Sequence, residues 1–304
     1  MEGAQAMGRA AEVSDVITVL GGGIMGRGIA RVFAAAEHEV RLRDVDEQSV
    51  GASMETLRKD LSRSVQRGDL DEPHAAAMLA RITPCTELPA AVEGAGLVIE
   101  AAPEDLELKR AIFAELDRVA PADAILATNT SALSITAIAA ATSTPHRVIG
   151  LHFFNPVHRM ALVEIVIGLQ TDRATVERAS AACAAIGKTT VEVADRAGFA
   201  TSRVNALIGN EAFHMLMEGV ASAEDIDTAL RLALGHPMGP FELVDLVGLD
   251  TRLAVLERLH ASLGERFRPS PLLVSLVDAG RLGRKTGHGV YRYDEGGRRI
   301  AGSA

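Results

Sequence analysis

A cluster of glycines at the end of a predicted strand is the feature that most restricts how this chain can fold. Residues 15–20 have the β-branched content of a strand, and Gly21, Gly23 and Gly26 follow in the spacing G-x-G-x-x-G before a helix expected at about 25–36. In this context the first glycine permits a tight turn, the second lets backbone approach a pyrophosphate, and the third allows close helix–strand packing. A tight turn without a ligand is the alternative. The context favours a dinucleotide at the helix N-terminus, where free N–H groups attract anions.

The second predicted strand, residues 39–45, carries an acidic side chain near its end. Asp44 stands where an acid can bind the hydroxyls of an adenosine ribose. This carboxylate would repel a 2′-phosphate, so the sequence favours NAD over NADP. Arg41 and Arg43 lie nearby and weaken that preference.

Strands and helices alternate through the first two thirds of the chain, which predicts an α/β fold with a parallel, doubly wound sheet of the Rossmann type. Further strands are predicted at residues 96–102, 124–130, 147–154, 162–168 and 189–195, and helices at 46–79 with a break at 67–73, at 106–120 and at 171–186. The remainder is helical by pattern, with an amphipathic helix at 203–220 and Ser222 as the expected N-cap of the next helix. We therefore expect a disordered extension at 1–14, a dinucleotide-binding domain at 15–198 and an all-helical C-terminal domain at 199–304.

The composition argues against several other classes of protein. The chain has 304 residues, a net charge of −9 and no tryptophan, so no nucleic-acid partner is expected. No apolar run reaches the ~18 residues that a membrane span needs. Cys85 and Cys183 lack metal-ligand spacing and suit a reducing compartment. We expect a cytoplasmic protein with no metal site and no membrane association.

Two ionisable side chains in apolar segments are candidates for catalysis. His152 lies near the end of the strand predicted at 147–154, and Glu164 lies within the apolar run 161–168. A buried, unpaired carboxylate is costly, so Glu164 needs a partner, and His152 is the expected one. The acid would orient the ring, and the other ring nitrogen would accept the proton of a substrate hydroxyl while hydride passes to NAD. The residues alone leave a structural His–Glu pair as open as a catalytic one.

Two small polar side chains lie close to these candidates in the predicted sheet. Ser131 directly follows the strand predicted at 124–130 and could hydrogen-bond the same substrate oxygen. Asn155 follows His152 in the segment GLHFFNP. Open α/β sheets present ligands at such strand ends.

Seven ordered motifs resemble the 3-hydroxyacyl-CoA dehydrogenase family over about residues 16–293. They read GGGIMGRGIA, VIEAAPEDLELKRAIFAEL, LATNTSALSIT, GLHFFNPVHRMALVEIV, ASAEDID, GHPMGPFELVDLVGLD and GRLGRKTGHGVYRY. They are most similar to the short bacterial 3-hydroxybutyryl-CoA enzymes. The resemblance implies reversible, NAD-dependent oxidation of a short-chain L-3-hydroxyacyl-CoA to the 3-ketoacyl-CoA. It also implies a homodimer formed through the C-terminal domain.

The resemblance also assigns roles to individual residues. It places the base at His152, the acid that orients it at Glu164 and a substrate-contacting serine at Ser131, and we add Asn155 as a second substrate-side donor. The implied cofactor contacts are Gly21, Gly23, Ile24, Met25, Gly26, Asp44, Glu104, Lys109, Ser131 and Lys285.

The implied coenzyme A contacts are basic. Lys59, Arg63 and Arg67 recur every four residues on one face of a predicted helix. By itself such a stripe is usually a solvated surface, but the resemblance favours contact with coenzyme A phosphates, above all at Arg67. The sequence departs from the family at Ser202, where an asparagine that helps to hold substrate is common. Asn205, one turn further on, could compensate.

Two kinds of alternative stay open after the resemblance is taken into account. One is a related dehydrogenase that acts on 3-hydroxyadipyl-CoA or on a free sugar acid of the gulonate type. The other is a non-catalytic, NAD-binding structural protein. Turnover of an acyl-CoA or of a sugar acid, followed at the NADH absorption band, separates the first kind from the second.

Overall fold

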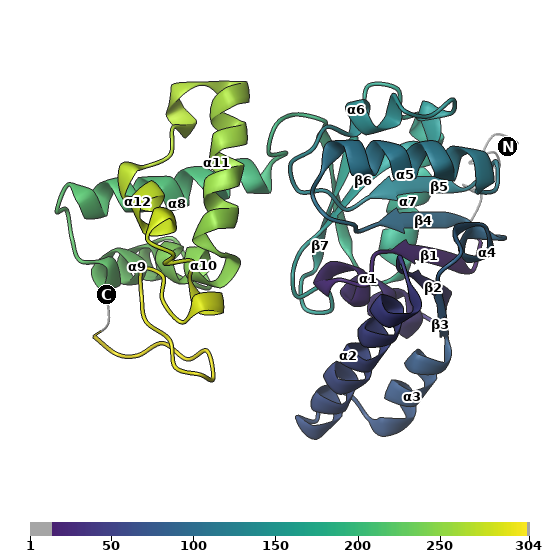
Figure 1. Ribbon diagram of the computed structural model, residues 1–304, viewed down its shortest axis with the longest axis horizontal. Coiled ribbons are helices and arrows are strands. Elements are labelled where there is room, and N and C mark those ends of the chain that lie inside the picture. The colour runs from purple at the N-terminus through teal and green to yellow at the C-terminus, as the bar shows by residue number, and fades with distance from the viewer. Residues whose placement is uncertain (1–13, 303–304) are drawn as a thin grey trace, which may run out of the picture. The chain divides into compact units, whose positions relative to one another are not determined.

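A computed structural model of the protein describes residues 14–302, which form two compact units that divide between Asp195 and Arg196 (Figure 1). Apart from Ser14, the extension expected at residues 1–14 lies outside the described residues. Across residues 14–302, none of the helices has the length and apolar character needed to cross a membrane.

The first unit is built on one eight-stranded sheet with the order β3-β2-β1-β4-β5-β6-β7-β8. Its strands are β1 (Val16–Leu20), β2 (Glu39–Arg43), β3 (Ile82–Cys85), β4 (Leu97–Glu100), β5 (Ile125–Thr128), β6 (Val148–Phe153), β7 (Leu162–Ile167) and β8 (Thr189–Ala194). The strand order reverses between β1 and β4, and ligands of open α/β sheets bind outside the carboxyl ends of the strands at such a point. The predicted Rossmann-type sheet is confirmed.

One strand pair departs from the parallel sheet expected from the sequence. β6 and β7 are antiparallel, with His152 directly opposite Glu164, whereas the other neighbouring strands are parallel. The connection between them, residues 154–161, contains no helix. A parallel pair needs a longer crossover of a dozen or more residues, so this short connection reverses the chain.

Helices cover both faces of this sheet (Figure 1). They are α1 (Ile24–Ala35), α2 (Glu47–Gln66), α3 (Glu72–Ala80), α4 (Leu88–Val92), α5 (Leu106–Val119), α6 (Ile135–Ala139), the short 3-10 helix η1 (Pro145–Arg147) and α7 (Arg173–Ala185). Alternate strand residues point to opposite faces. Accordingly, Ile17 and Ile99 join one core with Phe33 of α1, while the intervening Thr18 and Val98 are buried on the other face.

The sequence pattern located most of these elements but not all of them. The break expected within 46–79 is confirmed, because α2 ends at Gln66 and α3 begins at Glu72. The pattern does not predict β3, which has only four residues and contains Pro84. Pro84 is tolerated there because β3 is an edge strand that pairs only with β2.

The second unit is helical, as expected. It contains α8 (Thr201–Met217), α9 (Ala223–Ala233), α10 (Pro240–Val247), α11 (Leu249–Leu263) and α12 (Pro271–Asp278), with the 3-10 helices η2 (Glu265–Phe267) and η3 (Arg284–Thr286). The expected N-cap at Ser222 is confirmed, because its hydroxyl accepts the N–H of Asp225 at 3.1 Å. This hydrogen bond satisfies one of the free donors at the start of α9.

Two buried aspartates connect distant segments of the second unit. Asp227 accepts hydrogen bonds from the N–H of Phe241 at 2.8 Å and the hydroxyl of Tyr291 at 2.9 Å. Asp245 accepts the N–H of Tyr291 and the hydroxyl of Tyr293, each at 2.9 Å. Both carboxylates are 1% exposed, so these bonds fix the chain segment around 290 against α9 and α10.

Candidate active site

The glycine loop joins β1 to α1, and close backbone packing requires two of its glycines. Gly21 has φ +96°, which favours glycine, and a Cβ there would lie 2.8 Å from the carbonyl oxygen of Ala101. A Cβ at Gly26 would lie 1.8 Å from the carbonyl oxygen of Gly21. These two glycines would therefore be needed even if the loop bound nothing.

Gly23 is different, because nothing in the protein requires a glycine there. Its φ is an ordinary −63°, and an added Cβ would meet no atom within 4 Å. Gly23 is also the N-cap of α1, whose first turn has neither a side-chain cap nor an acidic residue. Open space in front of an uncapped helix N-terminus fits the pyrophosphate of a dinucleotide. The loop therefore suits the cofactor that the fingerprint predicts.

Asp44 lies directly after β2 and is held beside the glycine loop. Its carboxylate accepts the N–H groups of Gly22 and Val45, each at 2.8 Å. Arg43 donates to the carbonyl of Thr86 at 2.9 Å, and Arg41 is similarly bound to carbonyls in and just after α4. Both guanidinium groups are thus engaged away from Asp44, which removes the main objection to a preference for NAD.

His152 and Glu164 form the pair that the sequence predicts. They lie on adjacent strands in direct register, and His152 Nδ1 is 2.7 Å from Glu164 Oε2. Glu164 is fully buried and His152 is 5% exposed. The carboxylate fixes the orientation of the ring and stabilises the imidazolium that forms when the ring accepts a proton. Nδ1 is thus the ring nitrogen that faces the acid.

The loop that carries Ser131 is fastened by Glu104. Oε1 of Glu104 accepts the hydroxyl of Thr130 at 2.6 Å and the N–H groups of Ser131 and Ala132 at 3.1 and 3.2 Å. The side chain of Ser131 is exposed. Glu104, an expected cofactor contact, is therefore also the residue that sets the conformation of the loop bearing Ser131.

Asn129 fixes this loop against the strand that carries His152, a role that sequence reasoning missed. Its Oδ1 accepts the N–H of Phe153 at 2.9 Å, and Asn129 is 9% exposed. The loop after β5 thus begins beside the end of β6. An asparagine directly after a buried strand was the available signal.

Lys109 is an expected cofactor contact, but the structure shows it in a buried ionic network. Its Nζ lies 2.6 Å from Glu100 Oε1 and donates to the carbonyl of Ala102 at 3.1 Å. Glu100 also accepts the hydroxyl of Thr128 at 2.6 Å. Lys109 and Glu100 are 1% and 0% exposed. This network joins the ends of β4 and β5 to α5. Sequence reasoning missed Glu100, whose signal was an acid ending a buried strand.

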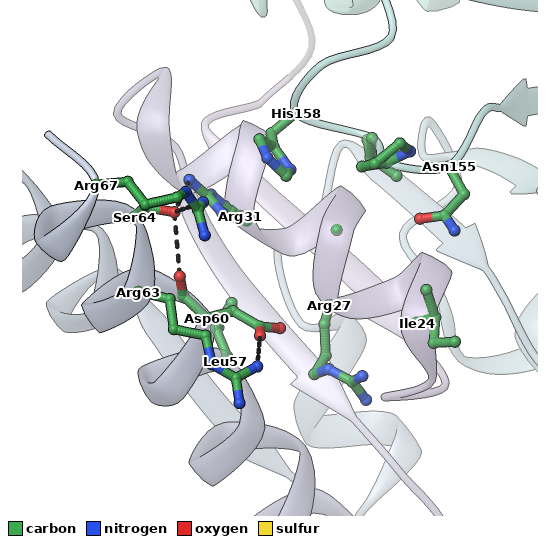
Figure 2. A pocket seen from close by; sticks show the side chains of 13 residues that line it. Ile24, Arg27, Arg31, Leu57, Asp60, Arg63, Ser64, Arg67, Asn155 and His158 are labelled. Atoms are coloured by element: carbon green, nitrogen blue, oxygen red, sulfur yellow. Dashed lines mark hydrogen bonds and ion pairs between the residues drawn. The ribbon is translucent and has the colours of Figure 1, made fainter. Parts of the chain in front are cut away.

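A cavity of about 260 Å³ opens between α1, α2 and the segment after β6. Arg63 and Arg67 of the predicted stripe line it, and Asn155 faces it from the side opposite α2 (Figure 2). Lys59 instead lies on the outer surface, 62% exposed, in an ion pair with Glu55. The structure therefore brings two of the three stripe residues to the cavity.

Two further arginines of α1 line the same cavity and were missed. Arg27 donates to the carbonyl of Gly22 at 2.6 Å, which links the cavity to the glycine loop. Arg31 and Arg67 both donate to the hydroxyl of Ser64, at 3.2 and 3.3 Å (Figure 2). Their four-residue spacing, which puts them on one helix face, was the available signal.

The remaining predicted site residues belong to the second unit. Lys285 Nζ lies 2.7 and 2.6 Å from the two carboxylate oxygens of Asp250. Ser202 and Asn205 lie on α8, both partly buried. In the described part of the chain, no cluster of three or more His, Cys, Asp or Glu side chains could hold a metal ion.

Comparison with protein families matches both units. The NAD-binding domain of 3-hydroxyacyl-CoA dehydrogenases matches residues 16–196, and the C-terminal domain of the same enzymes matches residues 198–293.

Known relatives agree with this match. The chain is 43% identical to a 3-hydroxybutyryl-CoA dehydrogenase of Bradyrhizobium diazoefficiens over 93% of this chain and 97% of that protein. It is 43% identical to a 3-hydroxyadipyl-CoA dehydrogenase of Escherichia coli over 91% of this chain and 58% of that protein. The crystal structure of (S)-3-hydroxybutyryl-CoA dehydrogenase PaaH1 from Ralstonia eutropha superposes with a TM-score of 0.88 at 40% identity, covering 93% and 100% of the two chains. The chain belongs to the 3-hydroxyacyl-CoA dehydrogenase family and is an NAD-dependent oxidoreductase.

Proposed function

We propose that this enzyme interconverts a short-chain L-3-hydroxyacyl-CoA and its 3-ketoacyl-CoA, with 3-hydroxybutyryl-CoA as the favoured substrate. The observation that carries the proposal is the 2.7 Å contact between His152 and the fully buried Glu164 in a unit with a dinucleotide-binding loop. The names of the two 3-hydroxybutyryl-CoA dehydrogenases above support the choice of substrate.

The proposed mechanism assigns proton transfer to His152. Its Nε2 accepts the proton of the C3 hydroxyl as the C3–H bond breaks and the carbonyl forms. NAD supplies the hydride acceptor when it is bound. Glu164 remains ionised and stabilises the imidazolium, and the hydroxyl of Ser131 hydrogen-bonds the reacting oxygen. In the reverse direction His152 returns the proton to that oxygen.

The proposed cofactor site follows the loops at the carboxyl edge of the sheet. Gly21, Gly23, Ile24, Met25 and Gly26 would hold the pyrophosphate with backbone, and Asp44 the adenosine ribose. Glu104, Lys109, Ser131 and Lys285 are proposed contacts at the nicotinamide end. For Lys109, whose ammonium is buried against Glu100, the proposed effect is electrostatic and acts through the loop after β4.

The proposed coenzyme A site is the arginine-lined cavity of Figure 2. Arg63 and Arg67 would bind phosphate groups there, while Asn155 would act as a hydrogen-bonding group toward the substrate. Ser202 of the second unit is a further proposed substrate contact. We expect Arg67→Glu to raise KM for the acyl-CoA and to leave NAD affinity unchanged. An unchanged KM at low salt would exclude Arg67 from the site.

A second candidate substrate is 3-hydroxyadipyl-CoA, because the similar Escherichia coli protein carries that name. The test is kcat/KM across 3-ketoacyl-CoAs of graded length, including the 3-ketoadipyl ester, with NADH and with NADPH. A maximum at acetoacetyl-CoA with NADH supports the proposal. A maximum at the dicarboxylic ester replaces it with the second candidate. Cofactor binding without turnover of any acyl-CoA would contradict both candidate substrates.

We further propose a cytoplasmic homodimer that associates through the second unit. The two cysteines, Cys85 and Cys183, are both free thiols, as a reducing compartment requires. Exposed apolar side chains such as Val204 on α8, 56% exposed, are compatible with association of this unit. Light scattering of the purified protein tests the dimer, and a monomer at micromolar concentration would contradict it.

A further inference from the structure

A second cavity lies directly beside the arginine-lined one, within the first unit. It has a volume of about 720 Å³, and Arg31 and His158 line both cavities. Its other charged lining residues are Asp69, Arg159 and Lys188. Because α1 passes from Arg27 in the first cavity to Ala35 in the second, the two cavities follow one another along this helix.

The pair of cavities concentrates positive charge on an acidic protein. Six lysine or arginine side chains and only two carboxylates line them, although the chain has a net charge of −9. The closeness of these positive charges affects the pKa of two side chains, Arg31 and His158. Burial lowers the pKa of Arg31, and Arg67 and Arg159 lower it further, while Asp60 and Asp69 act in the opposite direction. Burial, Arg31 and Arg159 likewise lower the pKa of His158. Like charges held this close repel one another, and a bound anion would relieve that repulsion.

Asp69 occupies the place between these cations. Its carboxylate lies 2.9 Å from the guanidinium of Arg67 and 3.7 Å from that of Arg159. Lys188 contributes differently, because its Nζ donates to the carbonyls of Val157 and Met160 at 2.6 and 2.7 Å. Lys188 therefore holds the lining segment after β6 in place, and Arg31 and Arg159 are the cations best able to meet a ligand.

We propose that this second cavity binds the 3′-phosphate of the coenzyme A ester, while the neighbouring cavity binds its pyrophosphate. The inference rests on the proposed function, since an acyl-CoA carries two separate phosphate groups beyond its pantetheine arm. Two adjacent cationic cavities, of which only the first is lined by Asn155, match that order. Arg31 lines both cavities and contributes to both phosphates, whereas Arg159 lines only the second and acts as the specificity residue for the 3′-phosphate.

The test compares acetoacetyl-CoA with its 3′-dephospho analogue in Arg159→Gln. We expect KM for acetoacetyl-CoA to rise about fivefold, KM for the dephospho ester to stay unchanged and kcat to be unaffected, as for one exposed charge-assisted contact. Arg173→Gln is the matched control, because Arg173 and Arg159 are each 61% exposed and Arg173 lies on α7 outside both cavities. An equal rise for both esters, no rise for either, or the same discrimination in Arg173→Gln would overturn the proposal.

Asp69→Asn gives the opposite result if the proposal holds. Removal of the competing carboxylate should lower KM for acetoacetyl-CoA about twofold and leave the dephospho ester unchanged. A rise in KM for acetoacetyl-CoA would contradict the proposed site.

A binding measurement separates failure of this inference from failure of the proposed function. Adenosine 3′,5′-bisphosphate is titrated by calorimetry into protein saturated with NADH, with inorganic phosphate as a second probe. Binding of the bisphosphate that weakens in Arg159→Gln supports the site even if no acyl-CoA is turned over. Turnover of acyl-CoA with no effect of Arg159→Gln on bisphosphate affinity overturns the site and leaves the function intact. Equal affinity for inorganic phosphate would reduce it to a general anion site and overturn the assignment to coenzyme A.

Discussion

The two units of this protein both bury carboxylates, but the partners of those carboxylates differ in kind. In the second unit Asp245 accepts the N–H groups of Val290 and Tyr291, at 2.8 and 2.9 Å, and the hydroxyl of Tyr293 at 2.9 Å. In the first unit Glu164 faces the imidazole of His152 at 2.7 Å. The degree of burial is the same, since Asp245 is 1% and Glu164 0% exposed.

The partners decide what each acid can do. Burial, together with the adjacent Asp227 or Asp245, raises the pKa of Tyr291 and Tyr293 above the ordinary tyrosine value. These hydroxyls keep their protons at neutral pH, so the acids of the second unit only fix the chain. An imidazole, unlike these hydroxyls, can serve as a proton acceptor in a reaction, so the acid of the first unit is the one suited to the proposed chemistry. Burial alone would not distinguish the two.

Among the substitutions considered, replacement of His152 should have the largest effect on activity. We expect His152→Gln to lower kcat about a thousandfold, because the proton of the substrate hydroxyl loses its acceptor. NADH affinity should stay within twofold, since the glycine loop is untouched. Stopped-flow and equilibrium fluorescence of bound NADH measure the two quantities. A variant that retains a tenth of the wild-type kcat would show that His152 is not the base.

Removing an acid of the second unit should affect stability and leave chemistry alone. Asp245→Ala leaves two N–H groups and one hydroxyl without their buried acceptor, so we expect unfolding of this unit to become easier by about 3 kcal/mol. The only two tyrosines, Tyr291 and Tyr293, lie here and there is no tryptophan, so tyrosine fluorescence in urea follows this unit specifically. Asp278→Ala, an exposed acid at the end of α12, is the control. Equal midpoints for the two variants would refute the structural role.

Glu164→Gln tests whether the charge of the buried acid serves catalysis, because glutamine keeps the shape of the side chain and loses its charge. We expect kcat to fall about a hundredfold, at the lower end of what proton-transfer groups contribute, with KM for the acyl-CoA nearly unchanged. Steady-state kinetics over a range of acetoacetyl-CoA separates kcat from KM. A fall in thermal stability with kcat preserved would instead put Glu164 in the same class as Asp245.

The sequence predicted the elements that local pattern controls. The glycine loop could be recognised because its residues are close together in the sequence. The pairing of His152 with Glu164 was predicted from one charged residue inside an apolar run. The antiparallel register that brings them together was missed, although the strands predicted at 147–154 and 162–168 leave too few residues between them for a crossover helix. The sequence pattern therefore identified the two paired residues, His152 and Glu164, but not the direction of the strands that carry them.

Interactions between distant segments escaped sequence analysis. The bond between Asp245 and Tyr293 joins residues 48 positions apart, and Glu100 combines with Lys109 and Thr128 from other elements. An acid that ends a buried strand, as Glu100 does, signals that a partner is needed, but the local pattern does not say which residue that partner is. Burial with specific donors is a property of the assembled unit, so it becomes visible only in the structure.

The smallest expected effect is a difference between the two units in how their free energy of unfolding depends on pH. In the second unit burial raises the pKa of Asp227, and of Asp245, above the unfolded value of 3.8, although N–H and hydroxyl donors oppose it. The folded unit then binds more protons than the unfolded chain above pH ~4, so its free energy of unfolding rises as pH falls from neutral toward that value. In the first unit burial also favours protonation of Asp117, but hydrogen bonds from Ser143 and Thr144 outweigh it and lower its pKa.

For Asp117 the sign is therefore reversed, and the first unit loses stability as pH falls below about 4. Urea unfolding at pH 7 and pH 5, followed by tyrosine fluorescence, should show the second unit slightly more stable at the lower pH. Asp227→Asn should reduce that gain, because an amide does not titrate. If the tyrosine-monitored midpoint falls between pH 7 and pH 5, the buried acids of the second unit are stabilised as anions. The contrast between acids that only fix the chain and an acid that supports proton transfer would then rest on their partners alone.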